Sequence, residues 1–235
     1  MKAEYIDHMG TDLTVVNAAR VSFDSESEHD YNPIADSGCW EGIVSVRDTK
    51  LINYLATHGH WTPFSHPQIT LRYTVPIFVA RQEFKHIVGF TRNEVSRRYV
   101  DDTPEFYVPE VWRSRPEGSV KQGSGGSFTE MLYTEDEDGF TCSVYEEYED
   151  IIHSILQTYK QMIEKGVAPE QARMVLPQSM YTSYYVTGSL AAFARFVKQR
   201  SDPHAQVEIQ DLAKMVDEVI KPLFPVSWKA LVGGE

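Results

Sequence analysis

The sequence predicts a single α+β domain, with antiparallel strands early in the chain and long helices late. Three observations indicate this class: an alternating segment at residues 69–75, a long amphipathic segment around position 155, and two further helical segments after position 188. At 235 residues and 42% hydrophobic composition, the chain can build one sizeable core. We therefore expect one domain over residues 1–235.

Three segments carry the expected elements of the first third. Residues 13–23 contain a short apolar run that could supply a strand, and residues 50–57 predict a helix closed by Gly59. In residues 69–75 isoleucine, leucine, tyrosine and valine alternate with threonine and arginine. Such alternation is typical of a strand with one buried face.

A helix is expected directly after this strand. Pro76 suits its first turn, and the following residues are good helix formers. Gly89 is expected to end or kink the helix. Residues 92–96 would then lie on a loop or in a new turn.

The second half predicts an insertion followed by helices. Residues 114–141 lack apolar periodicity and predict an exposed loop. An amphipathic helix of about twenty residues then runs to Gly166. Shorter helices are expected at residues 169–176, 189–199 and 204–220, with Asp202 as N-cap of the last.

Composition excludes several classes. The net charge of −12 and the pI near 5.1 argue against general binding to nucleic acid. No apolar run is long enough to cross a membrane, and the start of the chain does not resemble a signal peptide. The chain has only two cysteines, Cys39 and Cys142, so a disulfide framework is not expected and a cytoplasmic location fits.

The strongest local signal is a cluster of cations at residues 81–99. Five of the 22 lysines and arginines lie there: Arg81, Lys85, Arg92, Arg97 and Arg98. Because like charges repel, such a concentration in an acidic protein predicts a small anionic ligand such as a nucleotide phosphate. The alternative is an exposed basic helix face.

A second polar segment contains His58, His60 and His66. Three histidines so close together raise the possibility of a metal site, but neither a carboxylate nor a cysteine accompanies them. A hydrogen-bonded turn that shapes a pocket is the preferred interpretation, and we expect no metal. Arg173 and Glu208, taken singly, fit ordinary surface pairs.

Taken together, these segments resemble the flavin-dependent thymidylate synthases. The resemblance covers nearly the whole chain outside the insertion. Its motifs occur in the family's order: ARVSF at 19–23, HGHWTPFSH at 58–66, PIFVARQ at 76–82, Asn-Glu-x-Ser-x-Arg-Tyr at 93–99, FYVPEVWR at 106–113, ARMVLP at 172–177 and RSDPHAQVEIQ at 200–210.

The chain departs from the family pattern in two places. Lys85-His86-Ile87 stands where the family usually has Arg-His-Arg, and eight residues rather than seven separate this triplet from Ser96. Ser189 and Ala191 replace the asparagine and arginine of an Asn-x-Arg motif that contacts flavin in the family, and Arg195 replaces a further asparagine.

The resemblance implies conversion of dUMP to dTMP by a homotetramer with shared active sites. Methylenetetrahydrofolate would give the carbon, and NADPH would reduce a bound FAD. Arg200 would be the catalytic residue, because a cation facing the uracil favours negative charge on the ring. By family position, dUMP would be bound by Gln82, Lys85, Glu94, Ser96, Arg97, Arg98, Arg173 and Arg200, and FAD by Ser22, Thr62, Lys85, His86, Ile87, Glu94, Ser189, Ala191 and Arg195.

Since flavin carries the redox step, no reactive thiol is needed. Neither cysteine has a neighbouring histidine or arginine in the sequence to generate a thiolate. Three alternatives remain open: a flavoenzyme that leaves a hydroxymethyl group on uracil, a degenerate nucleotide-binding homologue without flavin, and a metal hydrolase built on the three histidines.

Overall fold

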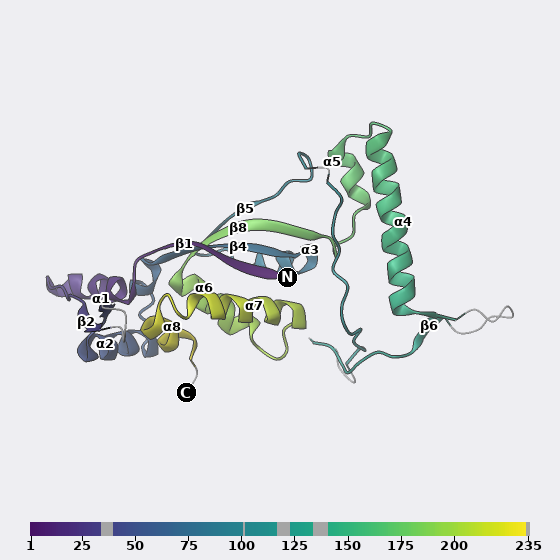
Figure 1. The fold of residues 1–235 in the computed structure, drawn as a ribbon. Helices are drawn as coiled ribbons and strands as arrows, with labels where there is room; N and C mark the ends of the chain where they lie inside the picture. The colour runs from purple at the N-terminus through teal and green to yellow at the C-terminus, as the bar shows by residue number, and fades with distance from the viewer. Residues whose placement is uncertain (34–39, 101, 117–122, 134–140, 234–235) are drawn as a thin grey trace.

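A four-stranded antiparallel sheet organises the chain. The structure, a computed structural model, describes residues 1–33, 40–100, 102–116, 123–133 and 141–233. The sheet has the order β1-β4-β8-β5, and its strands are β1 (Lys2–Met9), β4 (Gln68–Pro76), β5 (Phe90–Glu94) and β8 (Tyr181–Ser189). Helices α6 (Leu190–Arg200), α7 (Val207–Ile220) and α8 (Pro225–Val232) lie on one side of it (Figure 1). The α+β class predicted from the sequence is confirmed.

The central pair β4 and β8 forms because both strands place alternate side chains in the core. In β4, Ile69, Leu71, Tyr73 and Val75 are fully buried, as the alternation predicts. The two strands pair over their whole length, from Gln68 opposite Ser189 to Pro76 opposite Tyr181. β8 also pairs with β5 along its other edge, so β4 and β8 are the two central strands of the sheet.

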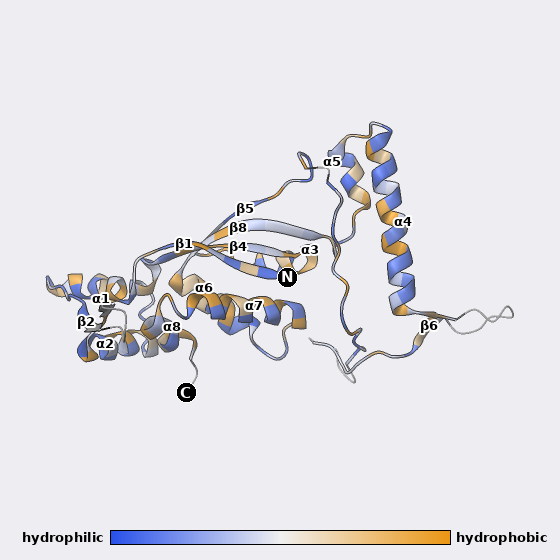
Figure 2. Cartoon of the chain, viewed as in Figure 1, coloured by the Kyte–Doolittle hydropathy of each residue, from blue (hydrophilic) through white to orange (hydrophobic). Residues whose placement is uncertain are grey.

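The core lies between the sheet and the helices beneath it. Figure 2 shows apolar residues on these helices where they face the sheet. Phe193 and Phe196 from α6, Val216 from α7 and Trp228 from α8 are buried there. The carboxylate of Asp12 accepts hydrogen bonds from the backbone N–H groups of residues 226 and 227, at 2.9 and 2.8 Å, and so caps the start of α8.

Two smaller groups of elements flank the sheet. At one end lie α1 (Asp12–Arg20), the 3-10 helix η1 (Val21–Phe23), the hairpin of β2 (Asp30–Pro33) and β3 (Trp40–Ile43), α2 (Val46–Thr57) and the 3-10 helix η2 (Pro63–Ser65). At the other end, α4 (Val144–Glu164) stands beside α5 (Pro169–Ala172), which continues into the 3-10 helix η3 (Arg173–Val175) (Figure 1). The predicted long helix before Gly166 is confirmed.

The segment of residues 114–141 is not wholly irregular. Its described residues include β6 (Met131–Tyr133), which pairs with β7 (Cys142–Ser143), and an isolated bridge that joins Arg113 to Ser127. Residues 117–122 and 134–140 lie outside the described part of the chain. No described helix is long and apolar enough to cross a membrane.

Several elements of the structure differ from the predicted ones in type or in their first and last residues. Residues 13–23 form helix α1 and a 3-10 turn rather than a strand. Residues 92–94, which belong to the segment 92–96 predicted as a loop or a new turn, are part of β5. Helix α3 (Ile77–Glu83) has Pro76 as its N-cap and ends well before Gly89. The last of the predicted helices, α7, begins at Val207 and has Gln206, not Asp202, at its N-cap.

Candidate functional site

The turn between α3 and β5 is held by a buried ion pair. Arg92 donates to both carboxylate oxygens of Glu83, at 2.8 and 2.6 Å, and to the backbone oxygen of His86 at 2.6 Å. Its guanidinium also lies over the rings of Phe84 and Phe90, 5.3 and 5.0 Å from their centroids. Arg92 is therefore a structural cross-link and does not share a ligand with the other cations of residues 81–99.

Glu83 is 1% exposed, and burial raises the pKa of its carboxyl against the opposing effect of Arg92. The hydroxyl of Tyr184 on β8 donates to the same carboxylate at 3.1 Å. The pair thus ties α3, β5 and β8 together. This arrangement fixes the positions of the side chains that α3 presents on its two faces.

One face of α3 borders a cavity of about 790 Å³, which we call the cationic cavity. Six of the residues predicted to bind dUMP line it: Lys85, Glu94, Ser96, Arg97, Arg98 and Arg173. Within the described residues, Arg97 pairs with Asp102, whereas no ion pair engages Arg98 or Arg173. The hydroxyl of Ser96 accepts from Nε of Arg98 at 3.4 Å. Segments 75 residues apart, from position 98 to position 173, thus meet in one cavity.

The other face of α3 carries a second constellation, the Arg200 cluster of Arg200, His86 and Gln82. Nε of Arg200 donates to Nε2 of His86 at 2.8 Å, and its Nη2 donates to the backbone oxygen of Gln82 at 3.1 Å. His86 is 7% exposed and packs edge-on against Phe196. Burial, followed by the charge of Arg200, lowers the pKa of His86 from 6.5 to about 4. The ring is therefore neutral and accepts the hydrogen bond.

The two constellations do not merge within one chain. Gln82 and Arg200 do not line the cationic cavity. A single chain therefore brings together most of the predicted phosphate ligands but leaves the predicted catalytic arginine on a different surface. Arg81 on α3 and Lys85 just after it line the cationic cavity, whereas Gln82 and His86, one position further along the chain in each case, do not. Successive side chains of a helix differ in direction by about 100°.

A third surface gathers part of the predicted FAD set. Ser189, Ala191 and Arg195 line a cavity of about 610 Å³, the α6 cavity, together with Trp61, Val88, Lys198 and Leu231. Nη2 of Arg195 donates to the backbone oxygen of Val88 at 2.5 Å. Apolar walls with two cations, Arg195 and Lys198, fit a ligand that combines an aromatic ring with an anionic diphosphate. The family motifs do not include Lys198, although its spacing from Arg195 places both side chains on one helix face.

The remaining predicted FAD residues lie elsewhere. Lys85 and Glu94 line the cationic cavity, and His86 belongs to the Arg200 cluster. Ile87 is 74% exposed beside Val88, which is equally exposed. Ser22 and Thr62 are exposed and do not line the α6 cavity.

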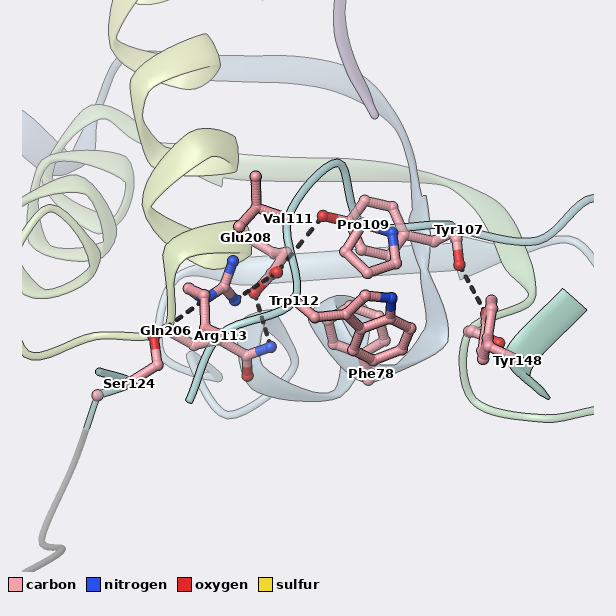
Figure 3. Close-up of a pocket in the computed structure, with 12 residues that line it drawn as sticks. Phe78, Tyr107, Pro109, Val111, Trp112, Arg113, Ser124, Tyr148, Gln206 and Glu208 are labelled. Carbon is pink, nitrogen blue, oxygen red and sulfur yellow. Dashed lines mark hydrogen bonds and ion pairs between the residues drawn. The ribbon is translucent and has the colours of Figure 1, made fainter. Parts of the chain in front are cut away.

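Figure 3 shows a further pocket, of about 490 Å³, whose aromatic walls include Phe78, Tyr107, Trp112 and Tyr148. On its polar side the carboxylate of Glu208 receives hydrogen bonds from Arg113 at 2.6 Å, Tyr107 at 3.4 Å and Gln206 at 2.8 Å. Glu208 is 3% exposed, so the expectation of an exposed pair at this residue is wrong. Its buried contacts come from residues about 100 positions away, which sequence spacing does not reveal.

The three histidines of the metal hypothesis lie in or near a turn. The ring of His58 bonds the backbone oxygen of Tyr54 at 2.8 Å, and its centroid lies 6.5 Å from that of His60. Across the described residues, no group of three histidine, cysteine or carboxylate side chains could hold a metal ion.

Cys142 is buried, and its thiol lies beside Glu147 at 3.9 Å. Burial and then the charge of Glu147 raise the pKa of this thiol, which disfavours the thiolate. Cys142 therefore lacks the surroundings of a nucleophile. Cys39 lies outside the described residues.

The fold and these surfaces define an α+β protein with a strongly cationic cavity beside its central sheet. The family model described as "Thymidylate synthase complementing protein" matches residues 4–226, and the chain belongs to this family. Relatives named flavin-dependent thymidylate synthase include those of Kosmotoga olearia (36% identity, 97% of this chain and 88% of the relative) and Thermotoga neapolitana (33%, 97% and 89%). The family resemblance inferred from the motifs is thereby confirmed, and with it membership of a family of methyltransferase enzymes.

Solved structures agree with this assignment. A crystal structure of the UMP/dUMP methylase PolB from Streptomyces cacaoi, bound with 5-Br dUMP, is 28% identical with a TM-score of 0.74 and covers 99% of this chain and 94% of that one. A second structure of the same methylase, bound with 5-Br UMP, is 27% identical with a TM-score of 0.76 and covers 99% and 93%.

Proposed function

We propose that this chain is a thymidylate synthase that methylates dUMP to dTMP, with methylenetetrahydrofolate as carbon donor and NADPH as reductant through a bound FAD. The observation that carries the proposal is the convergence of Ser96, Arg98 and Arg173 in the cationic cavity. Relatives at 33 to 36% identity named flavin-dependent thymidylate synthase support the chemistry. Residues 1–235 would act as one domain.

The cationic cavity suits the nucleotide phosphate. A dianionic phosphate needs donors that can approach from several sides, and arginine guanidinium groups supply them in a planar, bidentate form. Arg98 and Arg173 would take the phosphate oxygens, and the Ser96 hydroxyl would add a third donor. Arg97 contributes less in this assignment because Asp102 already engages its guanidinium.

The Arg200 cluster suits the uracil ring. Uracil is a weak carbon nucleophile until negative charge develops on its ring, and a cation facing its carbonyl groups stabilises that charge. His86 would hold the guanidinium of Arg200 in place by accepting from its Nε, which leaves the remaining N–H groups for the base.

Because the cationic cavity and the Arg200 cluster lie on different faces of α3, one nucleotide would use them from two copies of the chain. The homotetramer with shared active sites, implied by the family, meets this requirement. Apolar side chains support it: Ile87, Val88 and Trp61 are strongly exposed, and of the described side chains of α4 only Tyr159 is buried.

For FAD, we propose the α6 cavity with Ser189, Ala191, Arg195 and Lys198. The other predicted FAD residues, which lie outside this cavity, would reach the same flavin from the same or another copy: Ser22, Thr62, Lys85, His86, Ile87 and Glu94. Bound flavin would supply the redox chemistry. Arg195 would take over from the asparagine that the family has at its position, binding anionic groups while it anchors the backbone at Val88. We place the protein in the cytoplasm, acting on small molecules rather than nucleic acid.

The test is an assay of the purified protein. Flavin absorbance, with or without added FAD, and the mass of the product from dUMP, methylenetetrahydrofolate and NADPH are measured. A methylated nucleotide is the expected product. A hydroxymethyl product would overturn the assignment in favour of the alternative flavoenzyme, which the comparisons do not favour. Absence of flavin binding would favour a degenerate homologue.

A further inference from the structure

A chain of hydrogen bonds leads from the pocket of Figure 3 to Gln82 in the Arg200 cluster. The carboxylate of Glu208 accepts from the amide NH₂ of Gln206 at 2.8 Å, and the amide oxygen of Gln206 accepts from the NH₂ of Gln82 at 2.6 Å. Figure 3 shows Arg113, Tyr107 and Gln206 converging on Glu208 at the other end of this chain. These residues come from three separate parts of the sequence.

The negative charge of Glu208 determines which group donates and which accepts in each hydrogen bond of this chain. Burial would raise the pKa of this carboxyl, but the hydrogen bonds from Arg113, from its own backbone N–H and from Gln206 lower it below the ordinary value. An ionised carboxylate has only acceptors, so Gln206 must turn its NH₂ toward it. The oxygen of Gln206 then faces Gln82, and Gln82 must turn its own NH₂ to meet it.

The amide oxygen of Gln82 is consequently directed away from this chain of bonds. Among the described residues nothing donates to that oxygen, whereas the backbone oxygen of the same residue is bonded to Arg200 at 3.1 Å. Gln82 thus offers a fixed acceptor beside the donors of the Arg200 guanidinium. A free amide in this position could rotate and present either its oxygen or its nitrogen.

We propose that Glu208, acting through Gln206, is a positioning residue that locks Gln82 with its carbonyl oxygen toward an N–H or O–H donor of the bound nucleotide. Arg113 holds Glu208 in place from the opposite side. This inference rests on the proposed function and adds residues to it, since Glu208 and Arg113 would act through Gln206 and Gln82 rather than contact the nucleotide themselves. It also gives the ion pair in the pocket of Figure 3 a role beyond packing.

The variant Glu208→Gln tests the lock, because it keeps the shape and removes the charge. Arg113 and Tyr107 keep the amide oxygen of the variant on their side, so its NH₂ faces Gln206 and reverses the direction of both hydrogen bonds that lead to Gln82. We expect the affinity for dUMP, followed by flavin absorbance, to fall about tenfold, the value of one hydrogen bond. Glu218→Gln, at an exposed position on the same helix, is the matched control and should leave that affinity unchanged.

The double variant Glu208→Gln with Gln206→Glu separates positioning from simple structural damage. The new carboxylate at position 206 accepts from Gln82, and the new amide at position 208 donates to it, so the direction at Gln82 is restored. We expect dUMP affinity within about threefold of the native value. Gln206→Glu alone should bind poorly, because two carboxylates then face each other. A double variant as weak as Glu208→Gln would overturn the proposal.

Two nucleotide analogues identify the donor that Gln82 accepts. N3-methyl-dUMP lacks the ring N–H, and 2′,3′-dideoxy-UMP lacks the sugar hydroxyl. Glu208→Gln should weaken dUMP but leave the affinity for one of these analogues unchanged. An equal loss of affinity for all three nucleotides would overturn the proposed positioning of Gln82. If the native protein binds dUMP and Glu208→Gln binds it equally well, only this inference is overturned. If the native chain does not bind dUMP at all, the proposed function is overturned as well.

Discussion

The Nε atom of Arg200 donates to Nε2 of a neutral, buried His86 at 2.8 Å, although 114 residues separate them in the sequence. A protonated imidazole has no lone pair to accept this bond, so the contact exists only while the ring is neutral. The histidine of the Lys-His-Ile triplet is therefore an acceptor that holds the arginine. This relationship sets the behaviour of the Arg200 cluster with pH.

Stability should fall as the pH drops from about 6.5 toward 4. Burial, and then the charges of Arg200, Arg195 and Arg92, hold the folded-state pKa of His86 at about 4, below the ordinary 6.5. In that window the unfolded chain binds a proton that the folded chain does not, so the free energy of unfolding decreases with decreasing pH. Because one pKa unit corresponds to about 1.4 kcal/mol, the contribution of His86 is on the order of 3 kcal/mol.

Urea unfolding between about pH 7 and pH 4 measures this effect. The variant His86→Gln keeps an acceptor for Arg200 but has no titrating ring. The difference in unfolding free energy between the native protein and this variant should decrease as the pH falls from 6.5 to 4. Parallel curves for the two proteins would show that His86 titrates normally.

Arg200→Ala should lower kcat by about a hundredfold to a thousandfold, which is typical for loss of one preorganised electrostatic donor. Flavin binding should stay near normal, because Arg200 does not line the α6 cavity. Steady-state kinetics and flavin absorbance are the measurements. Lys214→Ala, at an exposed position on α7, is the control. Native turnover in Arg200→Ala would remove the residue from the mechanism.

The cation cluster illustrates how far the sequence leads and where it stops. The motifs predict that Arg98 and Arg173 bind the same nucleotide, and both residues line the cationic cavity. Arg92 belongs to the same cluster of cations at residues 81–99, yet it forms an ion pair with Glu83. Residues that are close in the sequence lie close in space, but their side chains can point in different directions. Whether Arg92 forms a buried ion pair depends on which face of β5 its side chain occupies.

Some helices and strands can be predicted from local sequence patterns, whereas others depend on distant parts of the chain. The alternation of residues 69–75 is a local pattern and predicts β4 directly. Residues 13–23 contain the β-branched pair Val15 and Val16, which favours a strand locally, but both side chains are buried against the core from helix α1. β5 contains Arg92, Asn93 and Glu94, which are typical of loops. Its extended form follows from pairing with β8, a partner almost one hundred residues away.

The ion pair of Arg92 and Glu83 should be the most sensitive polar contact of the fold. Arg92→Leu leaves a carboxylate buried without its partner, and we expect a loss of about 3 to 5 kcal/mol in the free energy of unfolding. Denaturant unfolding followed by circular dichroism measures it, with Lys160→Leu on the exposed side of α4 as control. The double variant Glu83→Leu with Arg92→Leu should lose less than Arg92→Leu alone. An equal or larger loss would mean that the unpaired carboxylate is not the cause, and that Arg92 stabilises the fold through its other contacts with the backbone oxygen of His86 and the rings of Phe84 and Phe90.

Arg98→Ala and Arg97→Ala should separate a ligand cation from a paired one. Both side chains line the cationic cavity, but within the described residues only Arg97 has an acidic partner, Asp102. Removing Arg98 should weaken dUMP binding by about tenfold to a hundredfold, the range for a charge-assisted hydrogen bond. Removing Arg97 should weaken it by less than about threefold, because that guanidinium is already neutralised. Titration of dUMP against flavin absorbance gives both constants, and thermal unfolding checks that each variant is folded. The reverse order of effects would place the phosphate at Arg97 and would require the bond to Asp102 to break when the nucleotide binds.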